Sequence, residues 1–225
     1  MIRLHIVAEG QTEEEFVNSV LALHLGTLQI VTDVRCIETS RNRRRIFRGG
    51  FLGYAQLKRD LERWMKEDDN ADSFFSTMLD LYKLPGDFPR HAQLRSKAPV
   101  ERALALEQSF ATDVNRQRFV PYIQLHEFEA LLFADPVCFS SRFLNQEAAV
   151  QELIKITNEF GNPELIDDGE HTSPSKRIIA RIPEYEGSKA TAGPLIAGKI
   201  GIPKLRQRCE HFDGWVTILE ALANP

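Results

Sequence analysis

Hydrophobic and polar residues in the first part of the chain alternate between the two-residue repeat of strands and the wider repeat of amphipathic helices. Four apolar or β-branched segments predict strands: RLHIVAEG, LQIVTDVRCIE, SFFSTMLDLY and FVPYIQL. Three segments between them predict helices: TEEEFVNSVLALHL, GYAQLKRDLERWMKED and APVERALALEQSFATDV. This alternation predicts an α/β fold, with a largely parallel sheet of about four strands and helices on both of its faces.

The pattern changes near residue 127, where the strand signals fade and short helical segments, broken by Gly and Pro, take over. We therefore expect an α/β core over residues 1–135 and a helical C-terminal region over residues 136–225 that packs on this core. The segment GNPELIDDGEHTSPS is the best candidate for a linker or mobile loop. FDGWVTILEALA predicts a final helix.

Composition is that of an ordinary globular protein, with 43% hydrophobic and 27% charged residues among 225. No apolar run approaches the roughly 20 residues of a membrane span. The N-terminal stretch MIRLHIVAEG lacks the features of a signal peptide, so we expect a cytoplasmic protein without membrane attachment. The three cysteines, Cys36, Cys138 and Cys209, form neither a zinc-binding pair nor a disulfide framework and are expected to be reduced.

Four acids surround the start of the first predicted helix in IVAEGQTEEEF, and their positions divide them into two groups. Thr12 to Glu15 fits a capping box, which predicts Thr12 as the N-cap and Glu15 as the acid that reaches back to it. Glu13 and Glu14 would then lie in the first turn, where the helix dipole favours negative charge. Glu9 comes earlier, at the carboxyl end of the first strand. Open α/β sheets place their ligand clefts there, so we expect a functional role for Glu9.

Asp80 ends the apolar strand segment in FFSTMLDLYKLP. A lone carboxylate in a strand that is buried on both faces is costly unless it is paired or binds a cation. One interpretation is a structural Asp that caps the following loop or pairs with an arginine. The other is a magnesium or manganese ligand beside Glu9, because parallel strands would bring both carboxylates to the same sheet edge. No organic cofactor is expected.

The stretch IQLHEFEALLF adds three candidate catalytic residues, His126, Glu127 and Glu129. The two glutamates would point to different faces of a helix but to the same face of an extended segment. At most one is therefore expected in the cleft with Glu9, unless the strand runs through Glu129. His126 has no partner at a spacing typical of zinc, and it could be a hydrogen-bonded core histidine or a proton-transfer group.

Basic residues gather locally although the net charge is −4. The stretch SRNRRRIFRGG carries Arg41, Arg43, Arg44, Arg45 and Arg48. These arginines form either a disordered surface loop or a contact for a polyanion such as nucleic acid. The stretch HTSPSKRI predicts a helix start with Lys176 and Arg177 in its first turn, a candidate phosphate cradle to which Lys189 could contribute. The alternative for these residues is scattered, solvated side chains.

Four stretches carry a family resemblance: VAEGQTEEEF, TMLDLYKLPGDFP, PYIQLHEFEALLF and PSKRIIARIPEYEGSKATAGPLIAGKIGIPKLRQRCEHFDGW. Together they resemble the bacterial domain-of-unknown-function family numbered 4276 (DUF4276), over nearly the whole chain. The N-terminal half of that family looks like a TOPRIM domain, the Rossmann-like, metal-binding fold of topoisomerases, primases and nucleases of the overcoming-lysogenization-defect (OLD) type. Family members are often encoded beside an ABC-like or SMC-like ATPase in what look like phage-defence cassettes, so the resemblance implies such an ATPase as a partner.

In the TOPRIM pattern a Glu-Gly pair follows the first strand and an Asp-x-Asp follows a later strand. Glu9 with its following glycine fits the first motif, and Asp80 fits the first Asp of the second. Tyr82 stands where the second Asp would be, which is a departure from the pattern. The resemblance therefore implies Glu9 and Asp80 as metal ligands and leaves one position to be filled by Glu127 or Glu129.

The sequence supports two functional hypotheses. The first is a magnesium- or manganese-dependent nuclease acting on DNA or RNA, in which carboxylates hold the metal, an acid serves as general base and basic residues hold the backbone. The second is a non-catalytic, degenerate TOPRIM-like module that docks on an ATPase and binds nucleic acid, which Tyr82 favours. A nucleotidyl-transferring or nucleotide-hydrolysing enzyme that uses the same carboxylates is a third possibility, but the chain has no GxxxxGK[ST] loop. In each case the chain could form a homodimer.

Overall fold

The structure, a computed structural model, describes residues 1–42, 45–48, 53–166 and 172–223, with the backbone alone described for 38–42 and 45–48. Its main sheet is parallel throughout and has the order β2-β1-β5-β6, with β7 also paired to β5. The strands of this sheet are β1 (Ile2–Ala8), β2 (Ile30–Cys36), β5 (Ser73–Asp80), β6 (Phe119–Val120) and β7 (Ile123–Gln124). All four predicted strand segments are confirmed. The last is split at Pro121, which has no N–H for the ladder.

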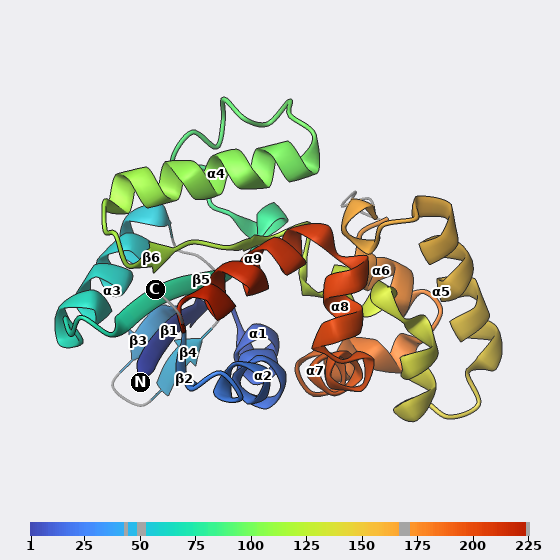
Figure 1. Cartoon of the computed structure of the whole chain (residues 1–225). Coiled ribbons are helices and arrows are strands. Elements are labelled where there is room, and N and C mark those ends of the chain that lie inside the picture. The colour runs from blue at the N-terminus through green and yellow to red at the C-terminus, as the bar shows by residue number, and fades with distance from the viewer. Residues whose placement is uncertain (43–44, 49–52, 167–171, 224–225) are drawn as a thin grey trace.

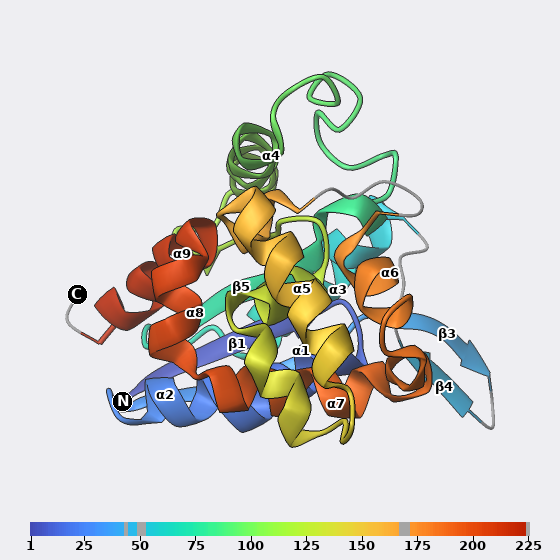
Figure 2. The same ribbon diagram turned by 90° about the vertical axis from the view of Figure 1, so that its right-hand side faces the viewer.

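A separate antiparallel hairpin, β3 (Glu38–Asn42) and β4 (Arg45–Arg48), follows β2. Figure 2 shows it extending away from the rest of the chain. The sequence did not predict these strands, because the arginine-rich stretch lacks the apolar alternation that marks a half-buried strand. Arg41, Arg45 and Arg48 belong to the two strands, whereas Arg43 and Arg44 lie outside the described residues.

Helices cover both faces of the sheet, as the sequence predicts, with α4 above the sheet and α1 and α2 below it in Figure 1. The α-helices are α1 (Gln11–Phe16), α2 (Ala22–Gly26), α3 (Tyr54–Glu67), α4 (Pro99–Val114), α5 (Glu147–Phe160), α6 (Pro174–Ile179), α7 (Lys189–Ile200), α8 (Ile202–Arg208) and α9 (Glu210–Ala221). A π-helical segment, η1 (Val17–Leu21), joins α1 to α2. The 3-10 helices are η2 (Leu81–Lys83), η3 (Phe128–Ala134), η4 (Pro136–Ser141), η5 (Pro163–Leu165) and η6 (Pro183–Ser188). No helix in the described part of the chain is long and apolar enough to cross a membrane.

Two apolar clusters lie on opposite faces of the sheet, as the alternation of side chains along β1 requires. Leu4 and Ile6 belong to the cluster that also contains apolar side chains of α1, α5, α7, α8 and α9. Val7 belongs to the cluster under α3 and α4. The sheet is thus buried on both faces. A ligand would therefore be expected to bind at the carboxyl ends of its strands.

The C-terminal helices share the first of these clusters with the sheet. In α9 the Trp215 indole N–H donates to the Ser76 hydroxyl of β5 at 2.9 Å. Its ring stacks on Tyr122, with centroids 4.2 Å apart and planes within 7°. The C-terminal region is helical as expected, while the domain boundary at residue 135 stays a prediction. Cys36, Cys138 and Cys209, which all lie within the described residues, form no disulfide bond.

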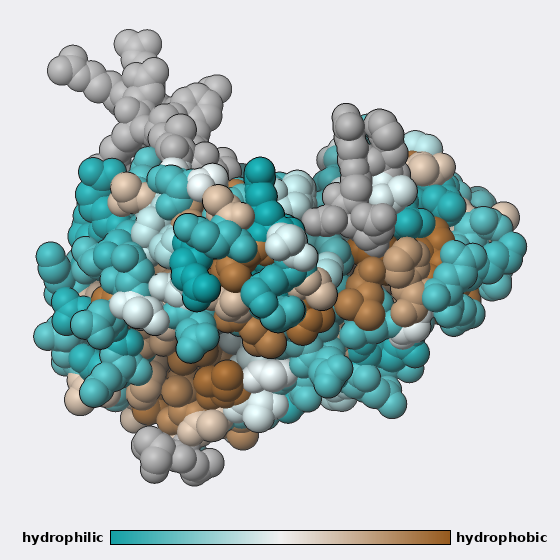
Figure 3. All heavy atoms as spheres, turned by 90° about the horizontal axis from the view of Figure 1, so that it is seen from above, coloured by the Kyte–Doolittle hydropathy of each residue, from teal (hydrophilic) through white to brown (hydrophobic). Residues whose placement is uncertain are grey.

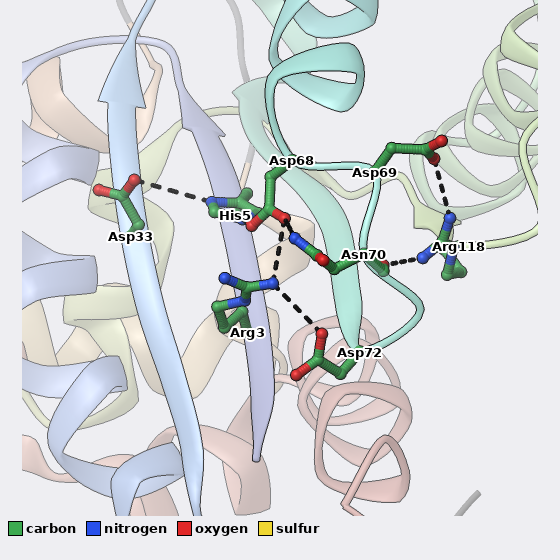
Figure 4. A network of polar contacts seen from close by, with 8 residues as sticks. All are labelled: Arg3, His5, Asp33, Asp68, Asp69, Asn70, Asp72 and Arg118. Carbon is green, nitrogen blue, oxygen red and sulfur yellow. Dashed lines mark hydrogen bonds and ion pairs between the residues drawn. The ribbon is translucent and has the colours of Figure 1, made fainter.

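A charged network ties β1 to the connection between α3 and β5 (Figure 4). The buried His5 has its Nε2 atom 2.8 Å from Asp68 Oδ2. Arg3 donates to both Asp68 Oδ1, at 3.1 Å, and Asp72 Oδ1, at 3.2 Å. These contacts link successive segments of the core, and we assign them a structural role.

The upper surface of the molecule is mixed, with apolar patches between hydrophilic regions (Figure 3). Residues of α4 and α9 border a cavity of ≈ 350 Å³. Its apolar wall includes the exposed side chains of Leu104 and Ile218 and the buried Trp215. The acids that the sequence singles out lie elsewhere, at the carboxyl edge of the sheet.

Candidate functional site

Glu9 and Asp80 meet at the carboxyl edge of the parallel sheet. Asp80 is the last residue of β5, and Glu9 directly follows β1, the strand beside it. The Glu9 amide donates to the Met78 carbonyl at 3.0 Å, and the Asp80 amide donates to Glu9 Oε2 at 2.9 Å. Both residues are buried, with 2% and 1% of their surface exposed. The strand order therefore brings together the two carboxylates that the sequence predicts as ligands.

Lys83, which the sequence reading missed, lies between these two carboxylates. It ends the 3-10 turn that follows Asp80, and its Nζ atom is 2.8 Å from Glu9 Oε1 and 3.2 Å from Asp80 Oδ2. Burial alone would lower the pKa of Lys83, but Asp80 and Glu9 raise it overall, so the ammonium form is stabilised. The only available signal was its position three residues after Asp80, the last residue of β5.

Asp80 has one more contact that fixes its orientation. Its Oδ1 atom accepts a hydrogen bond from the Phe128 amide at 3.0 Å. Burial, followed by the charges of Glu9 and Glu13, holds the pKa of Asp80 well above its usual range. The pairing with an arginine that was considered for Asp80 is replaced by this contact with a backbone amide and by Lys83.

Glu13 lies in the first turn of α1, as the sequence predicts, but the N-cap and the capping acid differ from the prediction. The helix begins at Gln11, with an extended Gly10 as its N-cap, two residues earlier than the capping box predicted for Thr12. The Gly10 amide donates to Glu13 Oε2 at 2.9 Å, so Glu13 takes the capping role that was assigned to Glu15. This register turns Glu13 into the interior, and Glu15 is exposed. Burial and the neighbouring Glu9 raise the pKa of Glu13 to about 7.

A cavity of ≈ 240 Å³ collects these groups at the sheet edge. Its lining residues are Glu9, Gly10, Thr12, Glu13, Asp80, Tyr82, Lys83, Glu127, Glu129 and Lys189. Both Glu127 and Glu129 reach it, whereas at most one was expected. Glu127 is extended and Glu129 lies in the first turn of η3, so the change of backbone conformation between them lets both face the same space.

The C-terminal region supplies polar partners to these two glutamates. Glu127 accepts hydrogen bonds from the backbone amide and, at 3.1 Å, from the hydroxyl of Ser175 at the start of α6. Glu129 accepts one from the Tyr185 hydroxyl at 3.3 Å and lies 3.6 Å from Lys189 Nζ. Burial and the charge of Glu127 raise the pKa of Glu129, against the opposing effect of Lys189.

The other predicted site residues have different surroundings. The first-turn amide of α6 is bonded to Glu127, and Lys176 and Arg177 do not line the cavity. Arg177 donates from Nε to the Thr172 carbonyl at 2.6 Å and lies over the Phe160 ring. His126 is buried with a left-handed backbone, φ 60°, and lies outside the cavity lining.

The donor set suits a hard divalent cation, because buried carboxylate oxygens from two strands already converge on one cationic group, Lys83. Burial, and then the charge of neighbouring carboxylates, raises the pKa values of Asp80, Glu13 and Glu129. Among the described residues, no three His, Cys, Asp or Glu side chains are arranged to hold a metal as they stand. Binding would therefore require local rearrangement, beginning with Lys83.

A family match extends over residues 8–220 and bears the description "Domain of unknown function (DUF4276)". The chain belongs to the DUF4276 family. Among solved structures, the chain is similar to the C-terminal region of the Xanthomonas campestris pv. campestris OLD protein, with a TM-score of 0.34, 16% sequence identity and 97% of each chain covered. No functionally curated protein matches the chain significantly. The family resemblance drawn from the four sequence stretches is thereby confirmed.

Proposed function

We propose that this DUF4276 protein is a divalent-cation-dependent hydrolase of phosphodiester bonds in nucleic acid, with a TOPRIM-like N-terminal half. One observation carries the proposal: Glu9 and Asp80, buried on neighbouring parallel strands, both contact the same ammonium group. Carboxylates that converge on one point at the carboxyl edge of an open sheet are suited to share a magnesium or manganese ion.

Glu9 and Asp80 would hold the metal, and Glu13 is close enough to join them, since it lines the same cavity and influences the pKa of Asp80. When bound, the ion would polarise the scissile phosphate and stabilise the leaving oxygen. Glu13 would thus be the third metal ligand, a role for which the sequence offered only Glu127 or Glu129. Glu127 is less suited to this role, because both of its carboxylate oxygens already accept hydrogen bonds from Ser175.

Glu129 and Lys189 have surroundings suited to the remaining roles. Glu129 lines the cavity, and burial with the charge of Glu127 raises its pKa, which is the direction that favours a general base. Lys189 lines the same cavity and is one-third exposed, so its ammonium can contact a phosphate oxygen. Its present partner is Glu129, and phosphate binding would exchange that contact.

The arginine-rich hairpin is proposed to hold the nucleic-acid backbone beyond the cavity. Its sequence carries five arginines, and its backbone extends outward from the molecule (Figure 2). Contacts to phosphates carry little sequence information, so we expect weak sequence preference and a strong dependence of binding on salt. Lys176, exposed at the start of α6, is retained as a candidate for the same role.

Cleavage assays test the proposal with supercoiled plasmid and with labelled single-stranded DNA and RNA, each with Mg²⁺, Mn²⁺ or EDTA. The variants are Glu9→Gln and Asp80→Asn, and Glu152→Gln, an exposed acid on α5, is the matched control. We expect metal-dependent cleavage by the wild type and the control, and a loss of at least about 100-fold in the two site variants. Equal cleavage by all four proteins would refute the assignment.

Two observations favour a second candidate, a non-catalytic module that binds nucleic acid and a partner ATPase. Tyr82 lines the cavity where a further acid would be expected, and Lys83 already neutralises part of the charge on Glu9 and Asp80. Calorimetric titration with Mn²⁺ separates the two candidates. Absence of binding by both the wild type and a folded Lys83→Met variant would support the module and exclude the hydrolase.

A further inference from the structure

Lys83 has a contact that the proposed hydrolase does not explain. Its Nζ atom bonds to one oxygen of Glu9 and one of Asp80, the pair to which we assign the metal. We propose that Lys83 is an internal counter-ion, which a divalent cation must displace in order to bind. This inference rests on the proposed function and adds a device that controls when the site is loaded.

Competition follows from the geometry of these contacts. The Lys83 ammonium lies 2.8 Å from Glu9 Oε1 and 3.2 Å from Asp80 Oδ2, which is ordinary ion-pair contact. A divalent cation held by the same two carboxylates would need the oxygens that Lys83 now contacts. Two cations cannot share that position, because their repulsion is strong inside a partly buried site.

The remaining contacts of the two acids come from groups that are held in place. Asp80 Oδ1 accepts from the Phe128 amide and Glu9 Oε2 from the Asp80 amide, both fixed by the backbone. The Lys83 side chain, by contrast, is 43% exposed and ends a three-residue turn. Of the groups bonded to these oxygens, Lys83 is therefore the one that can leave while the strands stay in place.

The Tyr82 ring offers the displaced Lys83 ammonium a second binding partner nearby. The Lys83 Nζ atom is already 5.3 Å from the centroid of the Tyr82 ring, and that residue is 44% exposed at the cavity mouth. Rotation about the flexible lysine stem can strengthen this cation–π contact at little cost. Tyr82, the departure from the Asp-x-Asp pattern, thus gains a role as a partner for the displaced lysine.

The thermodynamic consequence is a reduced affinity for metal. A site that is open in only a fraction of molecules binds with its intrinsic affinity multiplied by that fraction. If the Lys83 contact is formed in about 90–99% of molecules, removing it should tighten metal binding about 10- to 100-fold. The wild type would then bind metal only at higher metal concentrations. At lower concentrations Lys83 would remain the counter-ion of Glu9 and Asp80.

The test is calorimetric titration of the full chain with Mn²⁺ for the wild type, Lys83→Met, Lys83→Arg and Lys155→Met. Lys155→Met is the matched control, since it removes an exposed lysine that pairs with Glu152 on α5. We expect Lys83→Met to bind Mn²⁺ at least about tenfold more tightly than the wild type. Lys83→Arg keeps the charge and should remain within about threefold of the wild type, as should the control.

Thermal unfolding provides a second readout that is independent of activity. Without metal, Lys83→Met should melt below the wild type, because two buried carboxylates lose their counter-ion. Mn²⁺ should then raise its melting temperature more than it raises that of the wild type. This comparison also shows whether the variant folds.

The outcomes separate this inference from the proposed function. If Mn²⁺ binds the wild type and Lys83→Met equally well, Lys83 does not compete and the inference is overturned, while the hydrolase assignment stands. The inference also fails if Lys83→Arg gains as much affinity as Lys83→Met, because charge would then be irrelevant. If neither the wild type nor folded Lys83→Met binds Mn²⁺, the hydrolase proposal itself is overturned.

Discussion

Replacement of Glu13 by glutamine should make the protein more stable at alkaline pH. Glu13 is buried among carboxylates at the cavity, and its pKa rises from its ordinary value of 4.5 to about 7. The folded state holds this proton more tightly than the unfolded chain does. Protonation of Glu13 therefore stabilises the folded state fully below pH 4.5, and this stabilisation is lost as the pH rises through 7. Glutamine mimics the protonated acid and retains an oxygen that can accept from the Gly10 amide.

The size of the effect follows from the two pKa values. Between pH 5 and pH 8 the wild type should lose about 2.5 kcal/mol of unfolding free energy through Glu13 alone. Other acids at the site also contribute to the pH dependence of the wild type, but they are present in both proteins. The difference between wild type and Glu13→Gln therefore reports Glu13 together with its coupling to Glu9 and Asp80, and it should grow by about 2.5 kcal/mol over this range.

Urea unfolding followed by circular dichroism at pH 5.0 and pH 8.0, in the presence of EDTA, measures this difference. Glu15→Gln is the matched control, because Glu15 belongs to the same helix but is exposed. Its stability relative to the wild type should change little between the two pH values. A difference between wild type and Glu13→Gln that stays constant with pH, or that reverses in sign, would refute the burial argument.

Three further substitutions probe how the C-terminal region is held, each measured by urea unfolding against the wild type. Glu164→Ala removes a fully buried carboxylate that accepts from two amides at the start of α9, and should cost about 1–3 kcal/mol. Trp215→Phe removes the indole donor to Ser76 and should cost about 1–2 kcal/mol. Gly193→Ala would bring a methyl group within 3.0 Å of the Tyr185 hydroxyl and should cost about 1–3 kcal/mol. No measurable change in any one of them would contradict the contact that it tests.

The sheet was predictable because its cause is local. Strands of a parallel sheet that is buried on both faces must be apolar along their length, and such apolar segments can be recognised in the sequence. Adjacent parallel strands bring their carboxyl ends to one edge, so the meeting of Glu9 and Asp80 follows from the strand order. The hairpin had no comparable signal, since its residues are strongly polar.

The start of the first helix and the position of Lys83 could not be predicted from the pattern of hydrophobic and polar residues. The sequence predicted Thr12 as the N-cap, whereas the helix begins two residues earlier, with an extended Gly10 as its N-cap. Glu13 is buried at the cavity, which the capping-box pattern did not indicate. Lys83 was overlooked because a lysine after a turn is normally a solvated residue, and only the spatial closeness of two acids gives it a different role.

The helical C-terminal region contributes to the polar surroundings of the cavity. Glu127 and Glu129 belong to the segment that follows the sheet, yet their partners Ser175, Tyr185 and Lys189 come from the region beyond it. A carboxylate that is buried without such partners would be costly or would become protonated. The sheet supplies the acids that converge on Lys83, and the C-terminal helices determine the charge and hydrogen bonding of the acids opposite them. A candidate active site in this fold is therefore complete only when both regions are packed together.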